Sequence, residues 1–378
     1  MTRICIKMTF VGCAILWMSG CDGRSLQQWI AGAPKGETIE HRIAAAQAAA
    51  IAAGTPNLQN LNADTKTDLN AEFKYYTVVQ QLFSQGKYED LDKLADSLRQ
   101  TKATFSGGRS KLKIFYSGLL YFPNRKSPND LDWQTRIETL KQWRTQKPDS
   151  ITAAVSLAEA YYYYGWYARG ADYANKVSAS QWALFDERLK SAKQILDEAS
   201  HLKAKCPQWY LVMIDIGRSQ GGDADQEAAV FNQAITFEPA YRAYYIQYAQ
   251  YLMPKWSGNE GDWEQFAERM YVQLGPKQGP ITYFRIAINM NCCDYDASAI
   301  FTKAKLSWAK VKTGCQLTEQ VYGSSLENLN DCAKLAGEAE DRPYAKQLFT
   351  QIGNNWASGT WRYRQAFDQA RAWALSGT

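Results

Sequence analysis

The spacing of apolar residues is the feature that most constrains this 378-residue chain. From residue 71 onward, large apolar side chains recur every three or four positions, which is the period of an amphipathic helix. Two stretches illustrate the spacing: Phe73, Tyr76, Val79 and Phe83, and then Trp133, Ile137, Leu140 and Trp143. No Asn-Gly or Asp-Gly dipeptide lies between alternating apolar runs, so the marks of β-hairpins are missing. The sequence therefore predicts an all-α fold.

Prolines divide the middle of the chain into helix pairs of similar length. We predict helices over about 150–164 and 182–202, with ends near Pro207 and Pro239, which are 32 residues apart. This distance is close to the 34-residue period of tetratricopeptide repeats. Phe231, Ala234 and Ile235 before Pro239 also resemble the second helix of such a repeat. The resemblance implies stacked antiparallel helix pairs, a tetratricopeptide-like α-solenoid over residues 71–378, in which each pair buries its apolar face against its neighbours.

The first twenty residues have the pattern of a secretory signal peptide. Arg3 and Lys7 precede an apolar run over residues 8–18, which is too short for a membrane span of about 20 residues. Residues 18–21, Met-Ser-Gly-Cys, resemble the lipobox of bacterial lipoproteins. That resemblance implies cleavage before Cys21 and a diacylglycerol thioether on its sulfur, which carries fatty acids such as palmitate. An uncleaved anchor and a plain signal peptide are the alternatives.

The segment after Cys21 indicates where in the cell the folded domain is held. Residues 21–70 are interrupted by glycine and proline and then become rich in asparagine, which predicts a tether between the membrane and the folded domain. Asp22 resembles the signal that retains enteric lipoproteins in the inner membrane, although a chance polar residue would look the same. We therefore expect a lipid-anchored protein on the periplasmic face, with the inner membrane favoured.

The remaining cysteines fit an oxidising compartment. Four of them, Cys292, Cys293, Cys315 and Cys332, lie within 41 residues, and this clustering predicts one or two local disulfides. Buried free thiols are the alternative. A zinc site is disfavoured because there is no Cys-x₂-Cys pair and no histidine after His201.

Residues from about 75 to 360 resemble a bacterial family that is defined only as a domain of unknown function. The similarity is carried by residues 88–94, 105–119, 160–170 and 251–258. The family brings no established catalytic residues, so the resemblance implies none here.

Aromatic clusters provide the candidate binding residues. The run Tyr161 to Tyr164 covers all sides of a helix, so some rings face other helices and others face a surface. A second set shares one helical face, at spacings of three and four: Tyr241, Tyr244, Tyr248 and Tyr251. A face of tyrosines suits a partly wet groove that binds a partner, and ordinary core packing is the alternative.

Catalytic motifs are weak or missing. Residues 217–221 match Gly-x-Ser-x-Gly, but His41 and His201 both precede Ser219, whereas the histidine follows the serine in that hydrolase fold. No phosphate-binding loop, dinucleotide motif or metalloprotease motif occurs. The net charge of +5 comes without runs of like charge, which argues against nucleic acid as a partner. We expect no catalytic, cofactor-binding or metal-binding residues.

These expectations favour a non-enzymatic protein- or peptide-binding module in the periplasm. A scaffold for envelope machinery and an immunity lipoprotein that neutralises a secreted toxin are two forms of this hypothesis. The alternative from another class is an envelope enzyme that acts on glycans, which would require converging acids in a cleft lined by aromatic rings.

Overall fold

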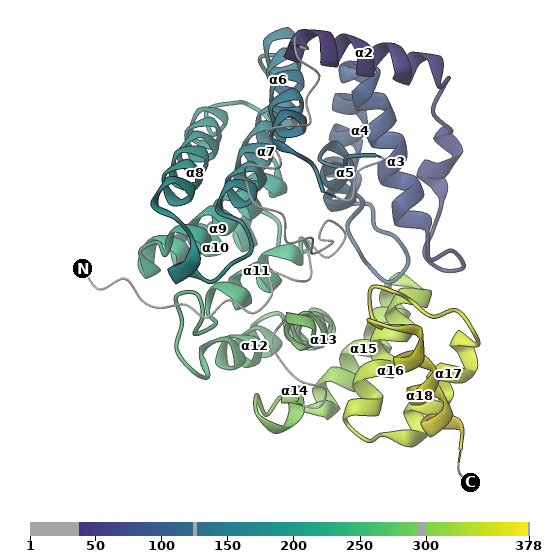
Figure 1. Ribbon diagram of the computed structural model, residues 1–378. Helices are drawn as coiled ribbons and strands as arrows, with labels where there is room; N and C mark the ends of the chain where they lie inside the picture. Colours follow the sequence, from purple (N-terminus) through teal and green to yellow (C-terminus); the bar gives the residue numbers. More distant parts are fainter. Residues whose placement is uncertain (1–37, 124–126, 294–298, 377–378) are drawn as a thin grey trace. The chain divides into compact units, whose positions relative to one another are not determined.

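The computed structural model describes residues 38–123, 127–293 and 299–376, and this part of the chain is all-helical (Figure 1). Besides the α-helices it contains two short 3₁₀ helices and a single isolated β-bridge between Thr104 and Ser110, with no strand. The described helices include none with the length and apolar character needed to cross a membrane.

The chain divides into two compact units that interleave along the sequence. Unit 1 contains residues 39–62, 74–102 and 112–220, and unit 2 contains residues 63–73, 103–111 and 221–376. The single domain predicted over 71–378 is therefore replaced by two units.

Unit 1 is built from α-helices, the first of which runs across the ends of its neighbours (Figure 1). They are α2 (Ile39–Ala52), most of α3 (Ala71–Ser84), α4 (Tyr88–Thr101), most of α5 (Lys111–Leu119), α6 (Asp130–Gln146), α7 (Ile151–Arg169), α8 (Ala179–Ala199) and α9 (Pro207–Gln220), with 3₁₀ helices at Leu58–Asn62 and Ala174–Lys176.

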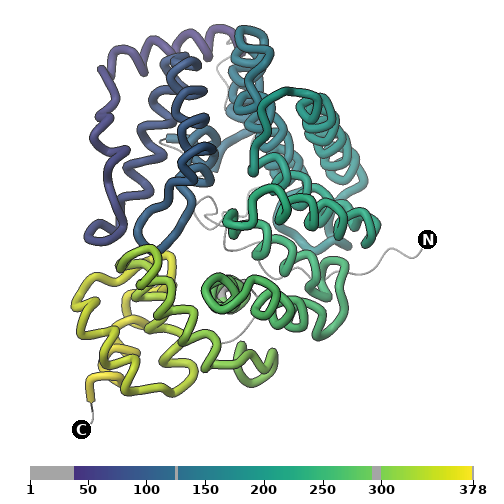
Figure 2. The backbone as a smooth tube through the Cα atoms, turned by 180° about the vertical axis from the view of Figure 1, so that it is seen from behind, coloured from purple at the N-terminus to yellow at the C-terminus, as the bar shows by residue number. Residues whose placement is uncertain are grey.

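Helix α7 forms the centre of unit 1. It packs against α6, α8 and α9 and is buried along most of its length. Its first half is rich in alanine, and small side chains let neighbouring helices approach closely. At Gly165 the approach is so close that a Cβ atom would lie 2.5 Å from a methyl carbon of Leu189 in α8. Both views of the backbone show α7 and α8 side by side (Figures 1 and 2).

Side-chain caps set where these helices begin. Asn129 caps α6 and Ser178 caps α8, each through a capping box with the residue three positions later. Ser150 caps α7 by accepting a hydrogen bond from the backbone N–H of Ala153. The predicted helices over 150–164 and 182–202 are thus confirmed as α7 and α8, with shifted ends.

Unit 2 contains the helices of the C-terminal half. They are α10 (Ala224–Phe237), α11 (Ala243–Tyr251), α12 (Asp262–Gln273), α13 (Gly275–Cys293), α14 (Ala299–Thr302), α15 (Trp308–Tyr322), α16 (Leu326–Glu338), α17 (Arg342–Ile352) and α18 (Arg364–Leu375). A disulfide between Cys315 of α15 and Cys332 of α16 joins two of them, with the Cα atoms 6.0 Å apart.

The predicted tether over 21–70 is wrong for residues 39–70. Helix α2 packs against α6, buries Ile43, and forms an ion pair of 3.0 Å between Arg42 and Asp132. Thr65 is also buried, and its hydroxyl donates to the carbonyl oxygen of Ser106 within unit 2. Helix α2 is rich in alanine, and the buried Ile43, the ion pair with Asp132 and a hydrogen bond from Gln85 to the carbonyl oxygen of Ala50 attach it to unit 1.

The predicted apolar faces are partly correct. Trp133, Ile137, Leu140 and Trp143 are all buried in α6. In α3, Val79 and Phe83 are buried as predicted, whereas Phe73 is exposed. Tyr75, Val78 and Leu82 are also buried. The apolar residues of α3 surround the helix, so their spacing alone left its phase open.

Candidate functional site

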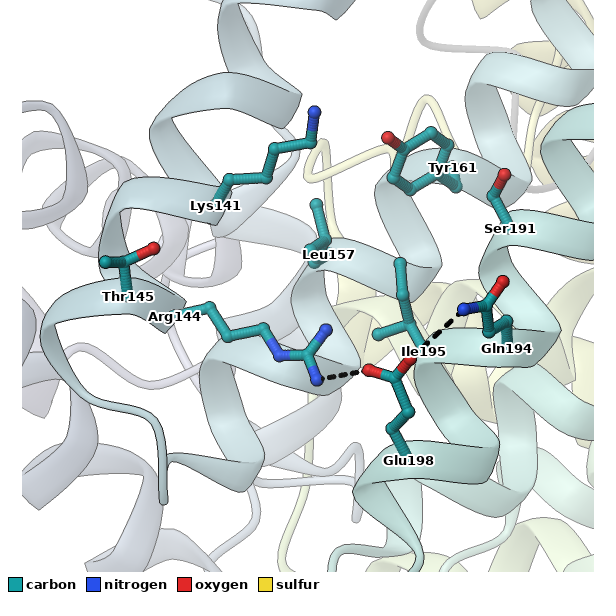
Figure 3. A pocket seen from close by; sticks show the side chains of 9 residues that line it. All are labelled: Lys141, Arg144, Thr145, Leu157, Tyr161, Ser191, Gln194, Ile195 and Glu198. Atoms are coloured by element: carbon teal, nitrogen blue, oxygen red, sulfur yellow. Dashed lines mark hydrogen bonds and ion pairs between the residues drawn. The ribbon is translucent and has the colours of Figure 1, made fainter.

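An open groove with a volume of about 610 Å³ lies between α6 and α8 in unit 1. Its floor is formed by Leu157 and Tyr161 of α7, which lie one helical turn apart. Figure 3 shows how the three helices contribute. The walls are lined by Lys141, Arg144 and Thr145 from α6, and by Ser191, Gln194, Ile195 and Glu198 from α8.

The groove follows from the arrangement of three helices. Because α7 lies between α6 and α8, the two outer helices stand apart, and the part of α7 between them becomes a floor. Leu157 and Ile195 are buried and Tyr161 is half-buried, so the bottom is apolar. The rims are polar and exposed. A volume of this size lies within the range of sites for small molecules or short peptide segments.

One end of the groove is closed by an ion pair. The guanidinium of Arg144 donates from Nη2 to Oε2 of Glu198 at 2.6 Å, and Nε2 of Gln194 donates to Oε1 of Glu198 at 3.2 Å. Both oxygens of the only carboxylate among the lining residues are thus engaged. The hydrogen bond from Arg144 is the main cause that holds the pKa of Glu198 below its usual value.

On the α6 rim, Lys141 forms only a solvent-exposed ion pair. Its amine lies 3.4 Å from Glu138, one turn away on the same helix, and both side chains are largely exposed. Figure 3 places this amine and the Tyr161 hydroxyl toward the open side, while Arg144 reaches across to α8. The groove therefore offers unused hydrogen-bond donors and a basic group over an apolar floor.

Unit 1 also contains a buried polar cluster between α5, α7 and α9. Oε1 of Glu159 accepts hydrogen bonds from Lys113 and Gln208, at 3.2 and 2.9 Å. Burial raises the pKa of Asp215 to about 6, although Arg218 lies 3.1 Å away. These groups are paired with one another and connect α5, α7 and α9.

The Gly-x-Ser-x-Gly motif belongs to this region and is not a nucleophile elbow. Ser219 is in the last turn of α9, and its hydroxyl donates to the backbone oxygen of Asp215 at 2.7 Å. The following turn contains Gly221 at a φ of +63°, and Asp223 caps α10. The motif is therefore a helix end followed by a turn.

Unit 2 contains an ionic cluster of three carboxylates and two arginines. Its members are Glu72, Arg109, Arg285, Glu327 and Asp331. Arg109 joins Glu72 at 3.1 Å and Glu327 at 2.5 Å, and Arg285 lies 3.8 Å from Asp331. Burial raises the pKa of Glu72 to about 7 and that of Asp331 to about 6.

This ionic cluster anchors the loop over 103–111. The carbonyl oxygen of Gly107 accepts hydrogen bonds from Arg285 at 2.5 Å and from Asn328 at 3.0 Å. The carbonyl oxygen of Gly108 accepts one from Arg242 at 2.7 Å. Because the acids face arginines, the cluster differs from the acid pair beside a water-filled gap that glycoside hydrolysis requires. We interpret the cluster as a structural element that holds this loop in place.

The tyrosine face of α11 lies in the core of unit 2. Tyr241, Tyr244, Tyr248 and Tyr251 are only 4%, 0%, 8% and 2% exposed. The helix lies between α10 and α12, so Tyr248 stacks on Phe231 at 4.3 Å and meets Phe266 at 5.2 Å between ring centroids. The prediction that these four tyrosines form a partner-binding face is therefore wrong. In contrast, Tyr161 from the other aromatic cluster does line a groove.

The cysteines are only partly within the described residues. Cys315 and Cys332 form the disulfide of unit 2, and Cys206 is a buried free thiol whose sulfur lies 3.2 Å from the Tyr116 hydroxyl. The side chains of Cys292 and Cys293 lie outside the described part, as do Cys21 and Asp22. Among the described residues, no group of three potential ligands comes together to hold a metal ion.

Sequence reasoning named the run Tyr161 to Tyr164 without showing which ring faces a surface, and it missed the other groove residues. Lys141, Arg144 and Glu198 are ordinary charged positions on exposed helix faces, and only the separation of α6 from α8 brings them around one concavity. The spacing of Ser191, Gln194, Ile195 and Glu198 shows that they share a helical face, but nothing in it indicates what that face meets.

Comparisons with protein-family models, curated proteins and solved structures gave no match for this chain. The resemblance to a family of unknown function therefore stays a prediction.

Proposed function

We propose that the chain is a lipid-anchored, non-enzymatic binding protein that takes a peptide segment of a partner protein in the groove between α6 and α8. The observation that carries the proposal is the groove itself, with its apolar floor at Leu157 and Tyr161 and its polar rims. A core of apolar contact surrounded by polar groups is the usual anatomy of a protein-binding site. Tyrosine is also enriched among the residues that dominate binding energy.

The helical architecture supports this proposal. In tetratricopeptide-like solenoids, stacked helix pairs present concave surfaces to peptides. The packing of α16 against α17 supports such an arrangement, and the burial of Phe231 and Ala234 in α10 is compatible with the resemblance to a second repeat helix. We include this solenoid character in the proposal.

The predicted lipid anchor adds a cellular location to the proposal. Acylation of Cys21 would place the groove at the periplasmic face of a membrane, and Asp22 favours the inner membrane. A scaffold and an immunity lipoprotein would use the same groove, and the identity of the bound partner separates them.

Site-specific photocrosslinking in intact cells tests the proposal. A benzophenone amino acid replaces Tyr161 in the groove or, as a control, Lys193 on the solvent-facing side of α8. We expect a discrete protein adduct from position 161 and none of the same mass from position 193. Equal adducts from both positions, or adducts with lipid or glycan alone, would contradict peptide binding in the groove.

A further inference from the structure

The groove between α6 and α8 has a marked chemical asymmetry. Its acidic wall is already satisfied, because both oxygens of Glu198 accept hydrogen bonds from Arg144 and Gln194. On the basic wall, Arg144 is occupied by Glu198, whereas Lys141 has only the exposed pair with Glu138, at 3.4 Å. Exposed pairs of this kind contribute little free energy, so a ligand replaces them at low cost.

The groove also sets the length of the peptide segment that can contact it. The residues that line it on α8 run from Ser191 to Glu198, which is seven positions and therefore about 10 Å at 1.5 Å per residue. An extended peptide covers this distance with about three residues at 3.3–3.6 Å each. The floor formed by Leu157 and Tyr161, together with Ile195 of the α8 wall, gives an apolar surface that favours an aliphatic side chain in the ligand.

From this asymmetry and length we infer that the groove recognises a short acidic-aliphatic peptide motif, about three residues in extended conformation, whose carboxylate pairs with Lys141. The inference rests on the proposed function and specifies its ligand. The carboxylate receives a charge-assisted hydrogen bond from the amine, the aliphatic side chain covers the floor, and the Tyr161 hydroxyl is placed to bond the peptide backbone. The Arg144–Glu198 pair marks the closed end.

Peptide binding to the full-length protein in detergent micelles tests the inference. The probes are three fluorescein-labelled peptides, Gly-Ser-Leu-Asp-Leu-Ser-Gly and the same sequence with asparagine or lysine in place of aspartate. Fluorescence anisotropy is measured at low and at physiological salt. We expect the aspartate peptide to bind at least tenfold more tightly than the lysine peptide, with the asparagine peptide between them, and the difference to shrink with salt.

Charge reversal on the protein provides the matched control. Lys141→Glu should weaken binding of the aspartate peptide at least tenfold and should strengthen binding of the lysine peptide. Lys193→Glu, at an equally exposed position on the outer side of α8, should change both affinities less than twofold. Melting temperatures of both variants should stay near that of the parent, because both lysines are exposed.

Three outcomes would overturn the inference. They are equal binding of all three peptides, unchanged affinity in Lys141→Glu, and binding of a chitin or maltose oligosaccharide in place of the peptides. If position 161 still crosslinks to a protein in cells while the peptides show no acidic preference, the proposed function stands and the ligand class is wrong. If neither experiment detects binding, both are wrong.

Discussion

Glu227 offers a sharp test of the energetics of unit 2. It lies on α10, is 7% exposed, and its Oε2 has no hydrogen-bond partner among the described residues. Tyr248 and Tyr251 are its neighbours on α11, and Phe231 is one turn further along α10. Burial alone raises the pKa of this carboxyl from 4.5 to about 7, so the folded state holds its proton more tightly than the unfolded chain does.

The direction of the pH effect follows from proton binding. Between pH 4.5 and 7 the folded state carries more protons at this position, so stability must fall as the pH rises through this window. The stabilisation is fully present below pH 4.5 and is lost above pH 7. The pKa difference corresponds to about 3 kcal/mol, since each unit is worth about 1.4 kcal/mol.

Glu227→Gln should therefore stabilise the protein in a pH-dependent way. The amide has the shape of the protonated acid and cannot ionise, so we expect a gain of about 3 kcal/mol at pH 8.5 and less than about 1 kcal/mol at pH 5. Urea unfolding of both proteins across this range measures the difference. The control is Glu260→Gln, at an exposed carboxylate of the same unit. A gain that is independent of pH, or a loss of stability at pH 8.5, would refute the reasoning.

Three further predictions concern other parts of the chain. Replacing Cys315 and Cys332 by alanine should cost about 3 kcal/mol, because the disulfide closes a loop of 17 residues, and a non-reducing denaturation series checks it. Gly107→Ala should cost at least about 2 kcal/mol, since the new Cβ would lie 2.1 Å from a side-chain nitrogen, whereas Gly54→Ala, in open space at a similar φ, should cost about 1 kcal/mol in thermal melts. Cys21→Ser should release the protein from membranes in cell fractionation, and persistent membrane binding would contradict acylation.

The sequence predicted what depends on local periodicity. The apolar stripe of α6 and the existence of α7 and α8 follow from the spacing of apolar residues and prolines along the chain. These features need no knowledge of what the helix packs against, and the structure agrees with them.

Features that depend on which helices meet could not be predicted in the same way. The tyrosines of α11 share one helical face, from which we predicted a binding groove, yet Phe231 and Phe266 cover this face. Conversely, the sequence indicates only that Lys141 and Glu198 are solvent-facing charges. The packing of their helices on either side of α7 places them around a groove. An amphipathic face shows that a helix has two environments, and tertiary packing decides which face is covered.

The division into two units shows the same limit. The loop over 103–111 belongs to unit 2 although the helices before and after it belong mainly to unit 1. Its anchors, Arg285 and Asn328, lie more than 170 positions later in the chain, and no local signal links them to Gly107.

Hydrogen exchange of the backbone amides tests the central claim most directly. The full-length protein is compared with and without the partner identified by crosslinking at Tyr161. The account predicts slower exchange in peptides that cover residues 138–147, 157–163 and 189–199, and unchanged exchange in α10–α18. Protection confined to unit 2, or no protection in α6–α8 when the partner is bound, would show that the groove is not the binding site.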